Sequence, residues 1–331
     1  MLYGLLDGIR TLSVIGMCKN AGKTTVLNSV ISELEAHNEV IGLTSIGRDG
    51  ERSDLVTNTK KPEIFVREGA VVATAEGLLR EGDISMEVLE TTGMPTPLGE
   101  IVIVRARSAG YVQIGGASIT EHQKRIRDSL FAFGCDRVLI DGAISRKSLG
   151  NPSLADGAIL SSGASYDPDV KKTAADTAYY AKLFSLPEWK GERACGGARY
   201  EALTKAGGAL ASEDISGLMP ALKEGARAVF LSGAVTDAAA KELLNFAKLL
   251  NETALVAEDA SRLLLKPAAF EKLERFSGGV FVKNGTRLAC VTLNPFSAYG
   301  MHYDKKEFRG LVEEALNRAG VAVPVMDVKD V

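Results

Sequence analysis

The chain has 331 residues, of which 46% are hydrophobic and 24% charged, and its formal net charge is −3. This composition is typical of a folded globular protein, and the mixed charges argue against nucleic acid or an anionic membrane as the main partner. The sequence has no apolar run of about 18 residues and no signal-peptide pattern, so we expect a cytoplasmic protein of two domains.

The first elements predict an α/β fold with a parallel sheet. Apolar runs predict strands at 11–15 and 39–46, and an amphipathic helix is expected from 22 to about 37. The apolar face of this helix consists of Val26, Val30, Ile31 and Leu34. A strand, loop, helix and strand in this order form a parallel crossover.

The next segment, 62–116, contains short β-rich runs interrupted by glycine and proline. We interpret it as a β-rich insertion or a β-rich edge of the sheet, because the α/β rhythm resumes after it. Strands are then expected at 137–143, 157–164 and 227–234, and these end in DGA, SGA and SGA. Small residues after a buried strand permit a tight turn into the next helix, where open α/β sheets bind their ligands.

We expect a nucleotide-binding domain over 1–187, a linker or mobile loop over 188–208, and a C-terminal α/β domain over 209–331. The linker assignment follows from its many glycines and charges. Asn284-Gly285, between two apolar runs, predicts a hairpin. A last strand near 321–326 is expected at an edge, because Pro324 cannot donate a hydrogen bond.

The stretch SVIGMCKNAGKTTVL, residues 13–27, resembles a phosphate-binding loop between a strand and a helix. The usual pattern is G-x-x-x-x-G-K-[ST], whereas here five residues separate Gly16 from Gly22, and Met17 stands where the first glycine is expected. The alternative is a glycine-rich turn that merely links the strand to the helix. The predicted nucleotide-binding residues are Gly16, Lys19, Asn20, Ala21, Gly22, Lys23, Thr24 and Thr25.

Cys18 lies inside this loop, close to a helix N-terminus, where a thiolate is stabilised. The alternative interpretation is a small loop residue without reactivity. The four cysteines of the chain have no C-x-x-C spacing, which disfavours a zinc site or a disulfide framework.

The longer spacing is similar to a G-x5-G-K-[TS] variant found in dethiobiotin synthetase and in the cobyrinate and cobyrate amidotransferases. The string KNAGKTT resembles the loop of the molybdopterin-guanine dinucleotide adaptor family. All belong to the class of P-loop proteins that includes the dimeric ATPases. The resemblance implies a Walker A loop that binds ATP or GTP with Mg²⁺, and the residues leave the choice of adenine or guanine open.

Acidic residues at two strand ends are the candidate metal ligands and catalytic groups. Asp141 ends the VLID run and is similar to a Walker B acid, and the resemblance places Asp49 where related proteins bind Mg²⁺ or orient the attacking group. Mg²⁺ prefers oxygen ligands, which predicts a site at Thr24, Asp49 and Asp141. Lys23, Asp49 and Asp141 are the predicted catalytic residues. The alternative for each aspartate is a turn or a helix cap.

Two further residues are singled out by the resemblance. Lys19 invites comparison with the signature lysine of the dimeric ATPases, which reaches the nucleotide of a partner copy in a homodimer, although it lies four residues before Lys23 and not five. Asn294 follows a predicted strand, where an Asn reads the purine in several related proteins; the alternative is that Asn294-Pro295 forms a turn.

Two functions remain for a nucleotide-binding protein of this kind. One is an NTP-dependent small-molecule ligase or kinase resembling dethiobiotin synthetase. The other is a hydrolase whose bound nucleotide changes its affinity for a partner enzyme. Three stretches favour the second, because they resemble nucleotide-binding subunits of lysine 5,6-aminomutase reactivases: PEIFVREGAVVATAEGLL, VLIDGAISR and VTLNPFSAYGMHYD. That resemblance implies two partners, a second reactivase subunit and a cobalamin-dependent aminomutase.

Overall fold

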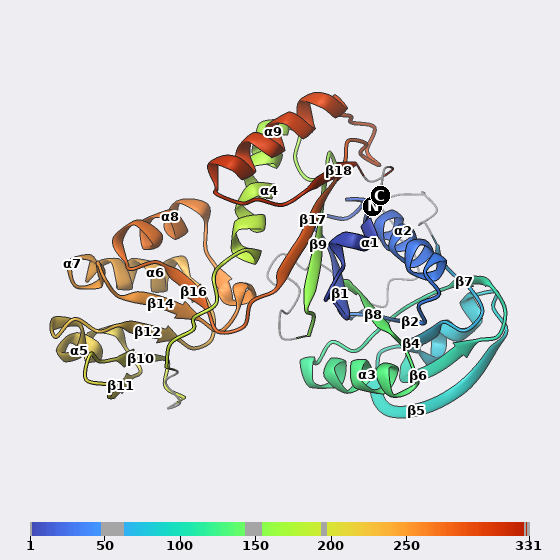
Figure 1. Cartoon of the computed structure of the whole chain (residues 1–331), viewed down its shortest axis with the longest axis horizontal. Helices are drawn as coiled ribbons and strands as arrows, with labels where there is room; N and C mark the ends of the chain where they lie inside the picture. The colour runs from blue at the N-terminus through green and yellow to red at the C-terminus, as the bar shows by residue number, and fades with distance from the viewer. Residues whose placement is uncertain (1, 48–62, 143–153, 193–196, 328, 330–331) are drawn as a thin grey trace. The chain divides into compact units, whose positions relative to one another are not determined.

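The computed structural model describes residues 2–47, 63–142, 154–192, 197–327 and 329 (Figure 1). The chain forms two compact units, each built from segments that are distant in sequence. The first unit comprises Met1–Arg146, Leu154–Ala181 and Arg287–Val331. The second unit comprises Lys147–Ser153 and Lys182–Thr286.

The first unit contains a mostly parallel nine-stranded sheet, in the order β18-β17-β9-β1-β8-β2-β4-β6-β5. The strands from β18 to β4 are parallel to their neighbours, and β6 and β5 complete one edge in antiparallel pairing. In that order the strands are Val325–Asp327, Arg287–Asn294, Gly157–Gly163, Thr11–Gly16, Arg137–Gly142, Ile41–Ser45, Val71–Ala75, Gly99–Ala106 and Met86–Thr96. The predicted α/β class with a parallel sheet is therefore confirmed.

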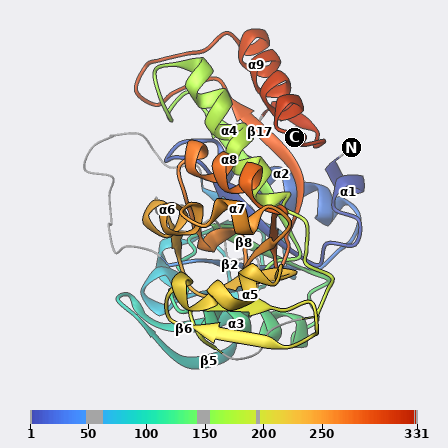
Figure 2. The same ribbon diagram turned by 90° about the vertical axis from the view of Figure 1, so that its left-hand side faces the viewer.

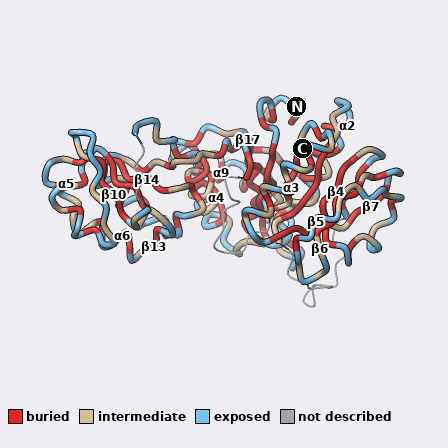
Figure 3. Tube along the Cα trace, turned by 90° about the horizontal axis from the view of Figure 1, so that it is seen from below, coloured by how far each residue is buried: buried red, intermediate tan, exposed pale blue. Residues whose placement is uncertain are grey.

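Helices cover both faces of this sheet. One face packs against α1, α2 and a two-stranded β3–β7 ribbon, and the other packs against α3 and α4, while α4 and α9 lie side by side (Figure 2). These elements, with the short η1, are α1 Leu2–Leu5, α2 Lys23–Ala36, β3 Ile64–Val66, η1 Glu76–Glu81, β7 Gly110–Val112, α3 Thr120–Ala132, α4 Val170–Phe184 and α9 Lys305–Arg318. The buried residues follow the central strands (Figure 3).

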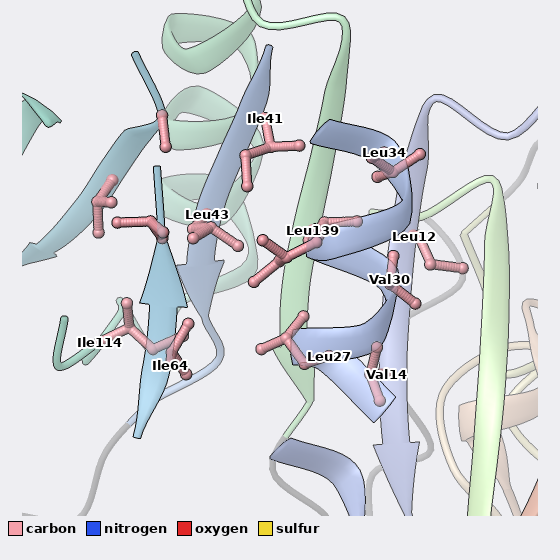
Figure 4. Close-up of a cluster of buried hydrophobic side chains, with 14 of the residues drawn as sticks. Leu12, Val14, Leu27, Val30, Leu34, Ile41, Leu43, Ile64, Ile114 and Leu139 are labelled. Atoms are coloured by element: carbon pink, nitrogen blue, oxygen red, sulfur yellow. The ribbon is translucent and has the colours of Figure 1, made fainter. Parts of the chain in front are cut away.

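The packing of α2 explains why this segment is a helix and where it lies. Its buried residues recur three and four positions apart, which places them on one side of an α-helix: Val26, Leu27, Val30, Ile31 and Leu34. They contact side chains of the central strands, including Leu12, Leu43 and Leu139 (Figure 4). This contact fixes the N-terminus of α2 above the carboxyl end of β1.

The second unit has its own five-stranded sheet, in the order β11-β10-β12-β14-β16. The strands in that order are Ala209–Ser212, Tyr200–Leu203, Ala228–Leu231, Ala254–Ala257 and Val280–Val282. The other elements are η2 Ile215–Leu218, α5 Met219–Lys223, β13 Val235–Thr236, α6 Asp237–Leu244, α7 Ala247–Leu250, η3 Ala260–Arg262, β15 Leu263–Leu264 and α8 Pro267–Phe276. The pairs β12–β14 and β14–β16 are parallel, so this unit is also an α/β layer.

The observed division differs from the predicted one. Residues 287–331 return to the first unit, because β17 pairs along its length with β9. The 188–208 segment is not only a linker, since β10 is a strand and Trp189 packs against the core of the second unit. The predicted edge strand is confirmed as β18, and the 62–116 segment forms an edge of the large sheet through β4, β6 and β5.

The hairpin predicted at Asn284-Gly285 is wrong. The strand before it, β16, pairs with β14, and the strand after it, β17, pairs with β9 in the other sheet. Asn284 N–H donates to the Glu258 carbonyl at 3.0 Å, a bond within the second unit, to which both residues belong. Burial against parallel neighbours has overridden the local turn preference.

Candidate functional site

The glycine loop, residues 16–24, leaves the carboxyl end of β1 and enters α2. β1 lies between β8 and β9, and the crossover through α2 leads to β2, beyond β8. The chain later adds β9 on the other side of β1, so successive strands lie on opposite sides of β1. Open α/β sheets form their ligand crevices at such a position.

Gly16 is buried, and a side chain at this position would require Lys23 to move. A Cβ at Gly16 would lie 2.7 Å from both Cγ and Cδ of Lys23. The side chain of Lys23 thus folds back over the end of β1, and the absence of a side chain at Gly16 makes room for it.

The main chain of the loop turns sharply twice. Asn20 has a φ of 63° and Gly22, the N-cap of α2, has a φ of 92°. No side chain caps the N-terminus of α2. Its first N–H groups are thus left uncapped by side chains, and the helix dipole makes this end attractive to anions.

Lys23 and Asp141 come together at the carboxyl ends of β1 and β8. Lys23 Nζ donates to the carbonyl of Gly142 at 2.9 Å, and Asp141 is in register with Val14 of β1. Burial raises the pKa of the Asp141 carboxyl, and the nearby Lys23 ammonium opposes this shift. Asp141 Oδ1 is buried and has no hydrogen-bond partner among the described residues. The Asp141 carboxyl, shielded from water, and the Lys23 ammonium therefore lie close together at these strand ends.

Hydroxyl and amide side chains bind the main chain at the ends of the neighbouring strands β2 and β4. They were not predicted from the sequence. Ser45 is in register with Asp141, and its Oγ accepts from Gly116 N at 2.9 Å. Thr74 Oγ1 accepts from Gly115 N at 3.0 Å. Gln123 Nε2 donates to the Ser45 carbonyl at 2.7 Å. The Gly115-Gly116 pair was the available signal for a close backbone approach.

The other side of the loop is held by β9, α4 and β17. Met17 N–H donates to the Ser161 carbonyl at 2.8 Å, and Thr177 Oγ1 lies 3.2 Å from Met17 Sδ. Asn294 Nδ2 donates to the Asn20 carbonyl at 3.0 Å. Ser161 and Thr177 were not predicted, although the small residues ending the 157–164 strand indicated this region.

Cys18 does not have the stabilised thiolate that its position suggests. Burial raises the pKa of its thiol to about 11, against the weaker opposing effect of Lys23. Of the two interpretations of Cys18, the small loop residue fits the structure and the stabilised thiolate does not.

The remaining predicted residues lie as follows. Lys19 and Thr25 are exposed, Thr24 is half-buried at the start of α2, and Ala21 is buried. Asp49 lies outside the described residues. Over the described ranges, no three His, Cys, Asp or Glu side chains gather closely enough to hold a metal ion.

None of the helices in the described part of the chain combines the length and apolarity needed to cross a membrane. Comparison of the chain with family models, with curated proteins and with solved structures finds no match.

Proposed function

We propose that the first unit is a P-loop nucleotide-binding fold that binds ATP or GTP with Mg²⁺ at the glycine loop and hydrolyses it. The observation that carries the proposal is the Lys23 ammonium, held 2.9 Å from the Gly142 carbonyl beside the Asp141 carboxyl. A cation placed there, at a helix N-terminus that no side chain caps, suits the outer phosphates of a nucleotide.

The residues fit such a ligand. The absent side chain at Gly16 leaves room for the Lys23 alkyl chain, and the unpartnered Oδ1 of Asp141 is an oxygen able to accept from water or to contact a hard cation. Bound Mg²⁺ would neutralise phosphate charge. Thr24 and Asp141 are the described residues proposed to hold it, together with Asp49.

In the proposed reaction, Lys23 exchanges the Gly142 carbonyl for the outer phosphate oxygens. Its charge then offsets the negative charge that develops during phosphoryl transfer. Asp141 orients the attacking water, and the Lys23 charge favours the ionised form of the Asp141 carboxyl. N–H groups at the start of α2 bind the remaining phosphate oxygens.

We assign the hydrolysis to an accessory role, in which the bound nucleotide changes the affinity of this protein for a partner enzyme. The support is the resemblance of three stretches to aminomutase reactivase subunits. Their described residues belong to the first unit: they include β3, β4, β8 and β17. The proposed partners are a cobalamin-dependent aminomutase and a second reactivase subunit.

The test is nucleotide turnover by the wild type and by Lys23→Ala, with exposed Lys306→Ala as the matched control. We expect Lys23→Ala to lose turnover by about a hundredfold or more, and Lys306→Ala to retain it. Turnover that changes on adding the aminomutase supports the accessory role, whereas turnover that requires a small acceptor indicates a ligase or kinase. A wild type that binds neither ATP nor GTP refutes the proposal.

A further inference from the structure

Asn294, at the end of β17, directs both ends of its amide to main-chain atoms. Its Nδ2 donates to the Asn20 carbonyl at 3.0 Å, and its Oδ1 accepts from Phe296 N at 3.2 Å. A carbonyl can only accept and an N–H can only donate, so these two partners fix the orientation of the amide. The side chain is therefore tied to the glycine loop.

The bond to Asn20 falls at the loop residue with the least favourable conformation. Within the described ranges, Asn20 and Asn38 are the non-glycine residues with positive φ, and Asn20 is the one in the glycine loop. Left-handed conformations are costly for residues with a Cβ and least so for Asn. A hydrogen bond to its carbonyl helps to hold the peptide between Asn20 and Ala21 in one orientation.

The orientation of this peptide decides where the next N–H points. In a trans peptide the carbonyl of Asn20 and the N–H of Ala21 point in opposite directions, and no cis peptide occurs in the described chain. β17 and β8 lie on opposite sides of β1 in the sheet. Because the Asn20 carbonyl is bound by Asn294 of β17, the Ala21 N–H points away from Asn294, and Lys23 meets Gly142 at the end of β8, on the other side of β1.

We propose that Asn294 is a positioning residue for anion binding: it orients the 20–21 peptide so that Ala21 N–H faces the polyphosphate. This inference rests on the proposed nucleotide binding and deepens it. It gives Asn294 a role that does not depend on the base, in contrast to purine recognition. Its effect must be the same for any ligand that carries the same phosphates.

The test compares Asn294→Leu with the wild type in titrations with ATP, GTP and inorganic tripolyphosphate, each with Mg²⁺. Leucine has a similar size, adds no charge and cannot donate. We expect the Kd of all three ligands to rise by about the same factor, five- to tenfold, as for loss of one ordinary hydrogen bond. KM for hydrolysis should rise with little change in kcat.

The matched control is Asn28→Leu. Asn28 makes the same pair of bonds away from the loop, since its Nδ2 donates to the Glu63 carbonyl and its Oδ1 accepts from Phe65 N. Asn28→Leu should lower the thermal midpoint comparably and leave tripolyphosphate binding unchanged. Asn294→Ala serves as the second variant if Asn294→Leu does not fold.

Three results would overturn the inference. The first is an unchanged tripolyphosphate Kd while ATP or GTP binds more weakly, which would indicate base recognition. The second is unchanged binding of all three ligands by a folded Asn294 variant. The third is a wild type that binds none of them, which refutes the proposed function itself and is thereby distinguished from the other two.

Discussion

Substitution of Gly16 by alanine tests the geometry on which the site depends. The new Cβ would lie 2.7 Å from two carbons of Lys23, about 1 Å closer than a favourable carbon–carbon contact. The lysine chain must move away, and a shift of this size stretches the 2.9 Å bond from Nζ to the Gly142 carbonyl beyond hydrogen-bonding distance. We expect the free energy of unfolding to fall by about 1–3 kcal/mol, the usual cost of overpacking.

The same displacement moves the ammonium out of the proposed phosphate position. Hydrogen bonds to charged groups contribute about 1.5–3 kcal/mol, so nucleotide affinity should fall at least tenfold. The assays are urea denaturation and ATP titration, with Gly4→Ala in α1 as the control, because a Cβ there has no atom within 4 Å. A Gly16→Ala protein as stable as the wild type, with unchanged ATP affinity, would refute this account of Lys23.

The remaining predictions concern titratable groups in the glycine loop and beside it. Burial raises the pKa of the Asp141 carboxyl in the folded state above its value in the unfolded state. The folded state therefore stays protonated to a higher pH, and the free energy of unfolding falls as the pH rises from about 4 through the folded pKa. In Asp141→Asn the free energy of unfolding, measured by denaturation from pH 4 to 8, should depend less on pH, and nucleotide hydrolysis should fall by about a hundredfold. If the variant and the wild type show the same pH dependence of stability, the Asp141 carboxyl is not desolvated. Cys18, with a pKa of about 11, should react with iodoacetamide slowly at pH 7.5 and faster toward pH 10. Rapid alkylation of Cys18 at neutral pH, located by peptide mass spectrometry, would contradict that environment.

The sequence predicted those parts of the fold that depend on neighbouring residues. The spacing of the apolar residues in α2 specifies both a helix and its buried side, and the apolar run ending at Asp141 specifies a buried strand. The return of 287–331 to the first sheet could not be read in the same way. It depends on β17 pairing with β9, more than a hundred residues earlier in the chain, and neither strand carries a local signal for that partner.

The same distinction applies to the candidate site. The lysine and the glycines of the loop were predicted from their spacing, and the structure shows the Lys23 side chain packed against Gly16 where a Cβ would lie. Two interpretations of Cys18 remained open from the sequence, because its proximity to a helix N-terminus is visible in sequence, whereas its desolvation is not. Asn294 was singled out for a strand-end position, but a sequence does not specify which carbonyl an amide will reach.

The extra residue in the glycine loop raises the question of how a longer loop keeps one shape. Ordering the backbone of one more residue costs about 1–2 kcal/mol of conformational entropy. Met17 N–H is held by the Ser161 carbonyl of β9, and the Asn20 carbonyl is held by Asn294 of β17. Two hydrogen bonds contribute about 1 kcal/mol each, which is enough to offset the cost of one residue. Because these anchors come from the protein, the cost of the extra residue is offset before any ligand binds, and a bound polyphosphate does not have to supply that part of the ordering free energy.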